Sequence, residues 1–134
     1  MQKKNLRSSN PKLLIVEDDK TTVDVLKIYI KDKYDLDWAK DAEEAFKKAK
    51  ENNYNGFLMD IGLPGNMNGM EVTKNLKEFK DNKTKPFIAI TAYAMIGDKE
   101  HFFSEGLTHY IVKPFNSEDL MDTIAKALNN EVNK

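Results

Sequence analysis

Residues 55–64 read N-G-F-L-M-D-I-G-L-P, and this stretch decides the fold. The three consecutive apolar residues from Phe57 to Met59 are typical of a strand that is buried on both faces of a parallel sheet. The strand ends at a carboxylate, Asp60, and the glycine and proline that follow predict a loop. An acidic side chain at the carboxyl end of a buried strand lies where open α/β sheets hold their ligands. The stretch therefore predicts a central strand with a candidate functional aspartate at its end.

The composition of the chain is that of an ordinary globular domain. It has 134 residues, of which 40% are hydrophobic and 32% are charged, and its net charge is −1. This balance suits one domain with a hydrophobic core and indicates no nucleic-acid partner. The lack of cysteine excludes disulfides, thiol nucleophiles and thiolate metal sites. We find no membrane-spanning apolar run and no signal-peptide pattern, so we expect a cytoplasmic protein without a membrane partner.

The hydrophobic pattern predicts one domain over residues 12–130. Residues 1–11 are polar and basic without periodicity, which indicates a disordered tail, and residues 131–134 form a second tail. Besides the central strand, the pattern predicts strands over residues 12–16, 34–38, 87–90 and 110–112, and helices over about 20–32, 42–51, 70–80, 94–105 and 117–128.

The alternation of five strands with five helices predicts the fold class. Parallel strands joined by right-handed crossovers form a three-layer α/β/α domain. For this length, a flavodoxin-like doubly wound sheet with strand order 2-1-3-4-5 fits better than a six-stranded Rossmann order. The stretch over 34–38 alternates apolar and acidic residues, which indicates a half-covered strand at an edge of the sheet.

The predicted strand order brings polar residues together at one edge of the sheet. Glu17 and Asp18 follow the first strand and would lie beside Asp60. Thr91 ends the fourth strand, and Lys113 follows the fifth. Two carboxylates about 4 Å apart repel each other by about 4 kcal/mol at an effective dielectric of about 20. The three acids therefore either take up protons or hold a cation, and a set of oxygen ligands points to Mg²⁺. The ammonium group of Lys113 suits a phosphate oxygen, or an ion pair with Asp60.

The motifs that the sequence lacks narrow the choice of ligand. Neither a P-loop nor a G-x-G-x-x-G follows a predicted strand, so we expect neither a nucleoside triphosphate nor a dinucleotide. We interpret His101 and His109 as surface residues and expect no metal or phosphohistidine chemistry at either. Asp60 is then the best candidate nucleophile, a carboxylate that attacks phosphorus beside Mg²⁺ and forms an aspartyl phosphate.

Four short motifs in order resemble a known family. They are Val16-Glu17-Asp18-Asp19, Met59-Asp60-Ile61-Gly62-Leu63-Pro64, Thr91-Ala92 and Lys113-Pro114-Phe115. Together, over about residues 12–128, they resemble the receiver domain of two-component response regulators, of the chemotaxis-regulator-like kind. No single motif is specific, but four of them at the ends of successive predicted strands are.

The resemblance implies a function for each residue at the acidic edge. Asp60 would accept a phosphoryl group from a phosphohistidine of a sensor kinase or phosphotransfer protein. Asp18, Asp60 and the backbone carbonyl of Gly62 would bind Mg²⁺, and Glu17 would act mainly through water. Lys113 would contact the phosphoryl group.

The resemblance also implies a conformational switch. Thr91 would move to donate its hydroxyl to the phosphoryl group, and Tyr110 would turn inward. The surface of helix 4, strand 5 and helix 5 would then repack to control a downstream protein partner, and receivers also dimerise through this face. Gly62 and Tyr93 occupy positions that tune phosphate lifetime in the family. Tyr93 would shield the phosphoryl group from water, which predicts slow dephosphorylation.

The sequence departs from the family pattern in one loop. Four residues separate Pro64 from Gly69 where the family usually has three, and Asn68 stands where an aspartate is common. In the first motif, we interpret Asp19 as the N-cap of the first helix rather than as a metal ligand.

Two alternative functions are open at this point. A receiver-like interaction module that is not phosphorylated would be expected to have a broken acid cluster or to lack the lysine, and neither change is present. An aspartate-nucleophile phosphatase would need a second acid where this chain has Gly62. We therefore expect a signalling phosphoacceptor that assists only its own phosphorylation and dephosphorylation, not an enzyme. We expect the chain to be a stand-alone regulator or a receiver from a larger protein such as a hybrid kinase.

Overall fold

A parallel sheet lies at the centre of the chain. The computed structural model describes residues 10–62, 68–78, 81–92 and 98–129, and in these ranges five parallel strands form one sheet in the order β2-β1-β3-β4-β5. The strands are β1 (Lys12–Val16), β2 (Asp35–Ala39), β3 (Gly56–Asp60), β4 (Phe87–Thr91) and β5 (His109–Val112). The predicted order 2-1-3-4-5 is confirmed, with β2 at an edge as the alternating pattern indicated.

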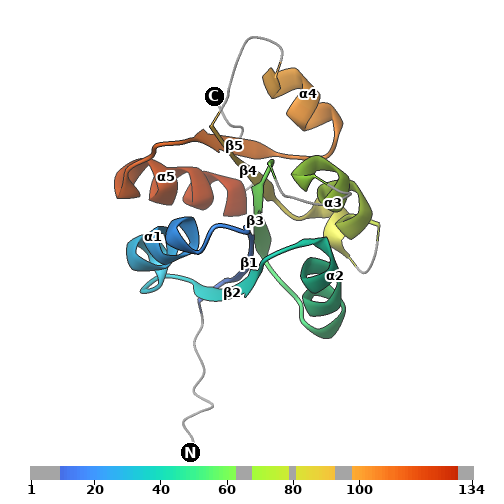
Figure 1. Ribbon diagram of the computed structural model, residues 1–134, viewed down its shortest axis with the longest axis horizontal. Helices are drawn as coiled ribbons and strands as arrows, with labels where there is room; N and C mark the ends of the chain where they lie inside the picture. Colours follow the sequence, from blue (N-terminus) through green and yellow to red (C-terminus); the bar gives the residue numbers. More distant parts are fainter. Residues whose placement is uncertain (1–9, 63–67, 79–80, 93–97, 130–134) are drawn as a thin grey trace, which may run out of the picture.

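Helices cover both faces of the sheet. In the same ranges they are α1 (Lys20–Ile30), α2 (Ala42–Glu51), α3 (Gly69–Leu76), α4 (Asp98–Ser104) and α5 (Ser117–Leu128), with a 3-10 helix at Asn82–Thr84. Figure 1 shows α1 and α5 on one side of the sheet and α2 and α3 on the other. Phe102 of α4 belongs to the same apolar cluster as the inner residues of α2 and α3. The three-layer α/β/α architecture is therefore confirmed.

The central strand contributes to both halves of the core. Every residue of β3 is buried, as expected from its continuous apolar run. Phe57 and Met59 pack toward α2, α3 and α4, whereas Leu58 packs toward α1 and α5. The ring of Phe57 stacks on that of Phe87 in β4, with 4.2 Å between their centroids. This packing fixes β3, and with it the position of Asp60 at the strand's end.

The helices next to the acidic edge begin at side-chain caps. Asp19 accepts a hydrogen bond from the backbone N–H of Thr21 at 3.2 Å, which confirms it as the N-cap of α1. Asn68 caps α3 and forms a reciprocal pair of hydrogen bonds with Glu71, each 3.0 Å long. The asparagine at this position therefore anchors the start of α3.

Some element ends differ from the predictions. The helix predicted over 70–80 begins at Gly69 and ends at Leu76, and the fifth strand begins at His109, one residue early. His109 is 5% exposed, so its interpretation as a surface residue was wrong: strand alternation turns it inward. Residues 1–9, 63–67, 79–80, 93–97 and 130–134 lie outside the described residues, and with them Tyr93, the longer loop after Pro64 and most of both predicted tails. None of the described helices is long and apolar enough to cross a membrane.

Candidate metal centre

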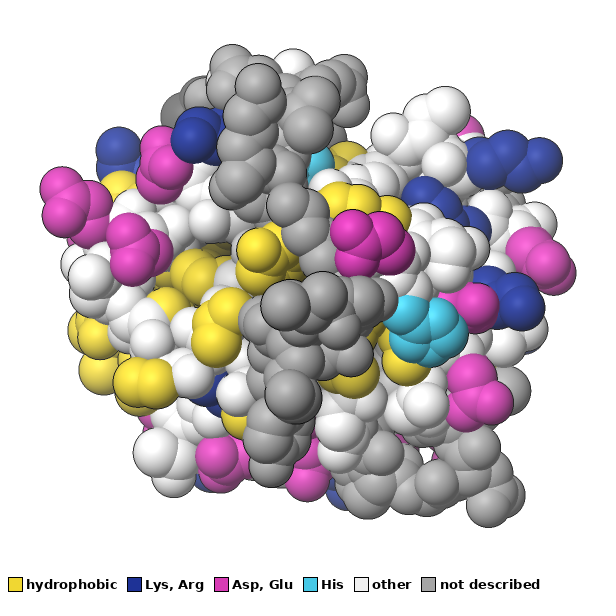
Figure 2. All heavy atoms as spheres, turned by 90° about the horizontal axis from the view of Figure 1, so that it is seen from above, with side chains coloured by type: hydrophobic (Ala, Val, Ile, Leu, Met, Phe, Trp, Pro, Cys, Tyr) yellow, Lys and Arg dark blue, Asp and Glu magenta, His cyan; other side chains and the backbone are white. Residues whose placement is uncertain are grey.

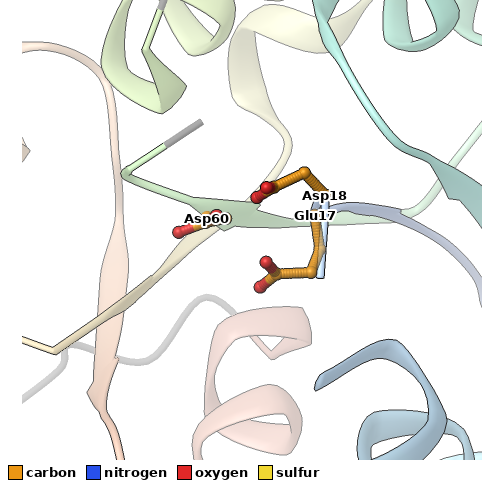
Figure 3. Close-up of side chains that lie close together, drawn as sticks. All are labelled: Glu17, Asp18 and Asp60. Atoms are coloured by element: carbon orange, nitrogen blue, oxygen red, sulfur yellow. The ribbon is translucent and has the colours of Figure 1, made fainter. Parts of the chain in front are cut away.

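Three carboxylates converge at the carboxyl ends of β1 and β3. Glu17 and Asp18 directly follow β1, and Asp60 is the last residue of β3. The register pairs Val16 with Met59, so the two strand ends lie side by side. One carboxylate oxygen from each acid lies within 4.8 Å of the others. Figure 3 shows the side chains of Glu17 and Asp18 extending toward the side on which Asp60 lies, as the strand order predicted.

The convergence is electrostatically unfavourable in the absence of a cation. Glu17 is 1% exposed and Asp60 is 8% exposed, whereas Asp18 lies at the surface. Burial, followed by the charge of Asp60, raises the pKa of the Glu17 carboxyl to about 7. Desolvation and the neighbouring Asp60 also raise the pKa of Asp18. The site therefore favours either protonation or the binding of a cation.

The hydrogen bonds of the Glu17 carboxylate indicate whether the site suits a cation. Its Oε2 atom accepts from the backbone N–H of Asp19 at 3.2 Å, but its buried Oε1 atom has no hydrogen-bond partner among the described residues. A buried carboxylate oxygen without a donor is costly, and a cation with ordered waters would supply the missing charge and donors. The ligands available are the carboxylate oxygens of Glu17, Asp18 and Asp60. This set fits Mg²⁺.

Lys113 lies at the same edge but pairs with a different acid from the one predicted. Its backbone N–H donates to the carbonyl of Thr91 at 2.7 Å, which joins the ends of β5 and β4. Its Nζ atom lies 3.6 Å from Oε1 of Glu17, so the ion pair predicted with Asp60 was wrong. The glutamate side chain is one methylene longer than that of an aspartate, which extends its carboxylate toward Lys113. The ion pair with Glu17 thus holds the ammonium group of Lys113 at the acidic edge.

The backbone after Asp60 is tightly packed. Asp60 accepts a hydrogen bond on Oδ1 from the N–H of Gly62 at 3.0 Å. Gly69, the first residue of α3, donates to the carbonyl of Ile61 at 3.2 Å. A Cβ atom at Gly69 would lie 2.1 Å from the carbonyl oxygen of Asp60. Only glycine allows this approach. Our sequence reasoning missed this role, although a glycine at the start of a helix beside the acidic loop was an available signal.

The switch residues occupy the strands next to the acids. Thr91 ends β4 and is 6% exposed, one residue beyond the register partner of Asp60. Tyr110 in β5 is half-buried, and its ring lies 6.5 Å from that of Phe103 in α4. The movement of Thr91 and Tyr110 and the metal contact of the Gly62 carbonyl stay predictions.

Comparison with known proteins places the chain. The model of the response regulator receiver domain family matches residues 13–125. The chain belongs to this family. Over 124 residues it is 35% identical to the response regulator ArlR of Staphylococcus saprophyticus, covering 92% of this chain and 54% of that protein. Over 115 residues it is 36% identical to the autoinducer 2 sensor kinase/phosphatase LuxQ of Vibrio vulnificus, covering 84% of this chain and 13% of that one. The receiver thus spans about half of the first relative and a small part of the second.

Solved structures share the fold. The chemotaxis protein CheY4 of Vibrio cholerae superposes with a TM-score of 0.84 at 27% identity, covering 89% of this chain and 99% of that one. The receiver domain of sensor histidine kinase PA1611 from Pseudomonas aeruginosa superposes with a TM-score of 0.81 at 26% identity, covering 90% and 99%. That structure has a magnesium ion coordinated in its active-site cleft. The family resemblance drawn from the sequence motifs is confirmed.

Proposed function

We propose that this receiver domain is a phosphoacceptor switch in which Asp60 takes a phosphoryl group from a phosphohistidine. The observation that carries the proposal is the cluster of three acids, in which the buried Oε1 atom of Glu17 lacks a hydrogen-bond partner among the described residues and lies 3.6 Å from Nζ of Lys113. Such a cluster favours binding of a cation and then of a group whose oxygens share that cation. The sensor kinase among the relatives supports a sensor kinase or phosphotransfer protein as the donor.

The residues present would divide the work of phosphoryl transfer. Asp18, Asp60 and the carbonyl of Gly62 would hold Mg²⁺, with Glu17 acting through water. Bound Mg²⁺ would supply positive charge that offsets the acid cluster and the phosphoryl oxygens. A carboxylate oxygen of Asp60 would attack phosphorus as the phosphorus–nitrogen bond of the donor breaks and the imidazole keeps the electron pair. With a proton on its other ring nitrogen, the donor leaves as a neutral histidine, and Asp60 becomes an aspartyl phosphate.

Lys113 and Thr91 would stabilise the product. The ammonium group of Lys113, held at 3.6 Å from Glu17, lies close enough to move to a phosphoryl oxygen. Thr91 would donate its hydroxyl to another oxygen and, with Tyr110, carry the change toward β5. Gly62 and Tyr93 would set the lifetime of the phosphate. The protein would act on no separate substrate, so we propose a signalling domain and not an enzyme, at work in the cytoplasm.

The surface along β5 supports a protein partner for the output. A shallow hollow of about 400 Å³ is lined by Tyr110, Val112 and Phe115 with the acids Asp119 and Asp122 of α5, among others. Figure 2 views the molecule from the side of β5 and shows hydrophobic side chains gathered there with acidic side chains along the border. A downstream protein, or a second copy in a phosphorylation-dependent dimer, would find apolar contacts on this face.

The test is intact mass after incubation with acetyl phosphate. We expect one phosphoryl adduct on the wild type with Mg²⁺ and none when EDTA replaces it. Asp60→Asn should prevent the adduct, whereas Asp122→Asn, an exposed aspartate on α5, should retain it. If Mg²⁺ binds but no donor gives an adduct, the alternative of an unphosphorylated interaction module gains support.

A further inference from the structure

A tryptophan on the edge strand contacts the backbone of the acidic site. Trp38 is the single tryptophan of the chain and lies on β2, in register with Ile15 of β1. Its side chain is half-buried. The indole N–H donates to the carbonyl oxygen of Glu17 at 2.6 Å, a short bond for a side chain 21 residues away in sequence. The contact reaches the residue at which β1 ends and the acid pair begins.

This bond completes a clamp on the peptide units around Glu17. The backbone N–H of Glu17 donates to the carbonyl of Ala39 at 3.0 Å, and the carbonyl of Glu17 accepts from Trp38. Both residues that form these hydrogen bonds with the backbone of Glu17 therefore belong to the end of β2. One residue farther along, Asp18 takes its direction from the same peptide plane, because the carbonyl carbon of Glu17 is bonded to the nitrogen of Asp18.

The indole is itself held in place. The Nζ atom of Lys27 in α1 lies 5.8 Å from the centre of the indole ring, within the range of a cation–π contact. Tryptophan has one donor and no acceptor, so its N–H forms this bond or must be solvated. Packing on α1 on one side and the bond to Glu17 on the other leave the ring few alternative positions.

We propose that Trp38 is a positioning residue, which orients the Glu17–Asp18 pair for the metal. The proposal rests on the proposed function, since it requires that the acidic edge binds a divalent cation. Residues that orient metal ligands typically change metal affinity by about 10–100-fold when replaced. Trp38 acts through the backbone of the ligand pair, one step farther away, so we expect about fivefold weaker Mg²⁺ binding without its N–H, the equivalent of one net hydrogen bond.

Two conservative variants separate positioning from stability. Trp38→Phe keeps an aromatic ring beneath Lys27 and removes the donor to Glu17. Tyr54→Phe is the matched control, because Tyr54 also donates a 2.6 Å hydrogen bond, but to the side chain of Asp37 on β2 and not to the acid pair. Each variant removes one aromatic donor from a 2.6 Å hydrogen bond that links β2 to another part of the fold. Only the bond of Trp38 ends on the acid pair.

The experiment is calorimetric titration of the full chain with MgCl₂, with urea unfolding of each variant alongside. We expect Trp38→Phe to raise the Mg²⁺ dissociation constant about fivefold, and Tyr54→Phe to leave it unchanged at a similar loss of stability. In the wild type, MgCl₂ should change the Trp38 fluorescence with the same dissociation constant. This second readout tests the proposal even if Trp38→Phe does not fold.

The outcomes separate the two proposals. Mg²⁺ binding by the wild type, with equal affinity in Trp38→Phe or with no change in fluorescence, would overturn the positioning role and leave the metal site intact. A wild type that binds no Mg²⁺ would overturn the metal site, and the positioning role with it. An equal loss of affinity in both variants would assign the effect to the stability of β2 and also overturn the positioning role.

Discussion

Replacing Glu17 by glutamine is expected to stabilise the metal-free protein. The variant keeps the shape of the side chain and its bond from the N–H of Asp19 but removes the buried charge beside Asp60. In the folded wild type, burial and then Asp60 raise the pKa of Glu17 from 4.5 to about 7. The pKa of Glu17 is higher in the folded than in the unfolded state. Its neutral form therefore stabilises the fold fully at a pH below 4.5, the pKa in the unfolded chain, and this contribution is lost as the pH rises toward about 7.

The size of the effect follows from that pKa difference. At about 1.4 kcal/mol for each pKa unit, the loss between pH 4.5 and about 7 amounts to about 3 kcal/mol for the wild type. Glu17→Gln has no proton to lose at this position. We therefore expect the variant to exceed the wild type in free energy of unfolding by about 3 kcal/mol more at about pH 8 than at about pH 4.5.

Urea unfolding in EDTA measures this difference. Wild type and Glu17→Gln are unfolded at both pH values, with Glu43→Gln, an exposed glutamate on α2, as the control for removing a charge. Mg²⁺ at the higher pH should stabilise the wild type more than Glu17→Gln, because binding offsets the charge that the variant lacks. A variant that is less stable than the wild type at about pH 8, or whose advantage does not change with pH, would show that the buried charge of Glu17 does not destabilise the metal-free protein.

Two further predictions concern the close approach of Gly69 to the end of β3 and the pH dependence of stability that Tyr54 causes. Gly69→Ala would place a Cβ atom 2.1 Å from the carbonyl of Asp60, so we expect a loss of more than about 2 kcal/mol in urea unfolding and slower phosphorylation by acetyl phosphate. In Gly56→Ala, at the start of β3, the added Cβ atom would meet only side-chain atoms at 3.3–3.5 Å, so the phosphorylation rate should stay unchanged. Equal rates for the two variants would contradict this role of Gly69. Burial, followed by the hydrogen bond to Asp37, raises the pKa of Tyr54 above its ordinary 10.0, so ionisation of the unfolded chain should lower stability above that pH. Tyr54→Phe should reduce this decline between about pH 9 and pH 11, and an unchanged slope would argue against it.

The elements that lie on continuous apolar runs could be predicted from sequence. The run from Phe57 to Met59 is apolar at every position because helices cover both faces of β3, and such a run carries its own signal. The convergence of Glu17 and Asp60 followed from strand order alone, since parallel strands end at the same edge. The family motifs added the roles of these residues but were not needed to bring them together.

Contacts that depend on side-chain reach could not be predicted. The pairing of Lys113 with Glu17, in place of Asp60, depends on the length of two flexible side chains over several strands. The alternating pattern placed Trp38 on an edge strand, but no local signal shows that its N–H meets the carbonyl of Glu17. His109 was misplaced because the predicted strand began one residue later and left it outside; as the first residue of β5 it lies on the same inward face as Ile111.

The most direct test of the central claim is the position of the phosphoryl group. After incubation with acetyl phosphate and Mg²⁺, reduction with borohydride converts an aspartyl phosphate to homoserine, which peptide mass spectrometry locates. We expect homoserine at position 60, dependent on Mg²⁺. Homoserine at another aspartate, or none while the wild type binds Mg²⁺, would contradict the assignment of Asp60 as the phosphoacceptor.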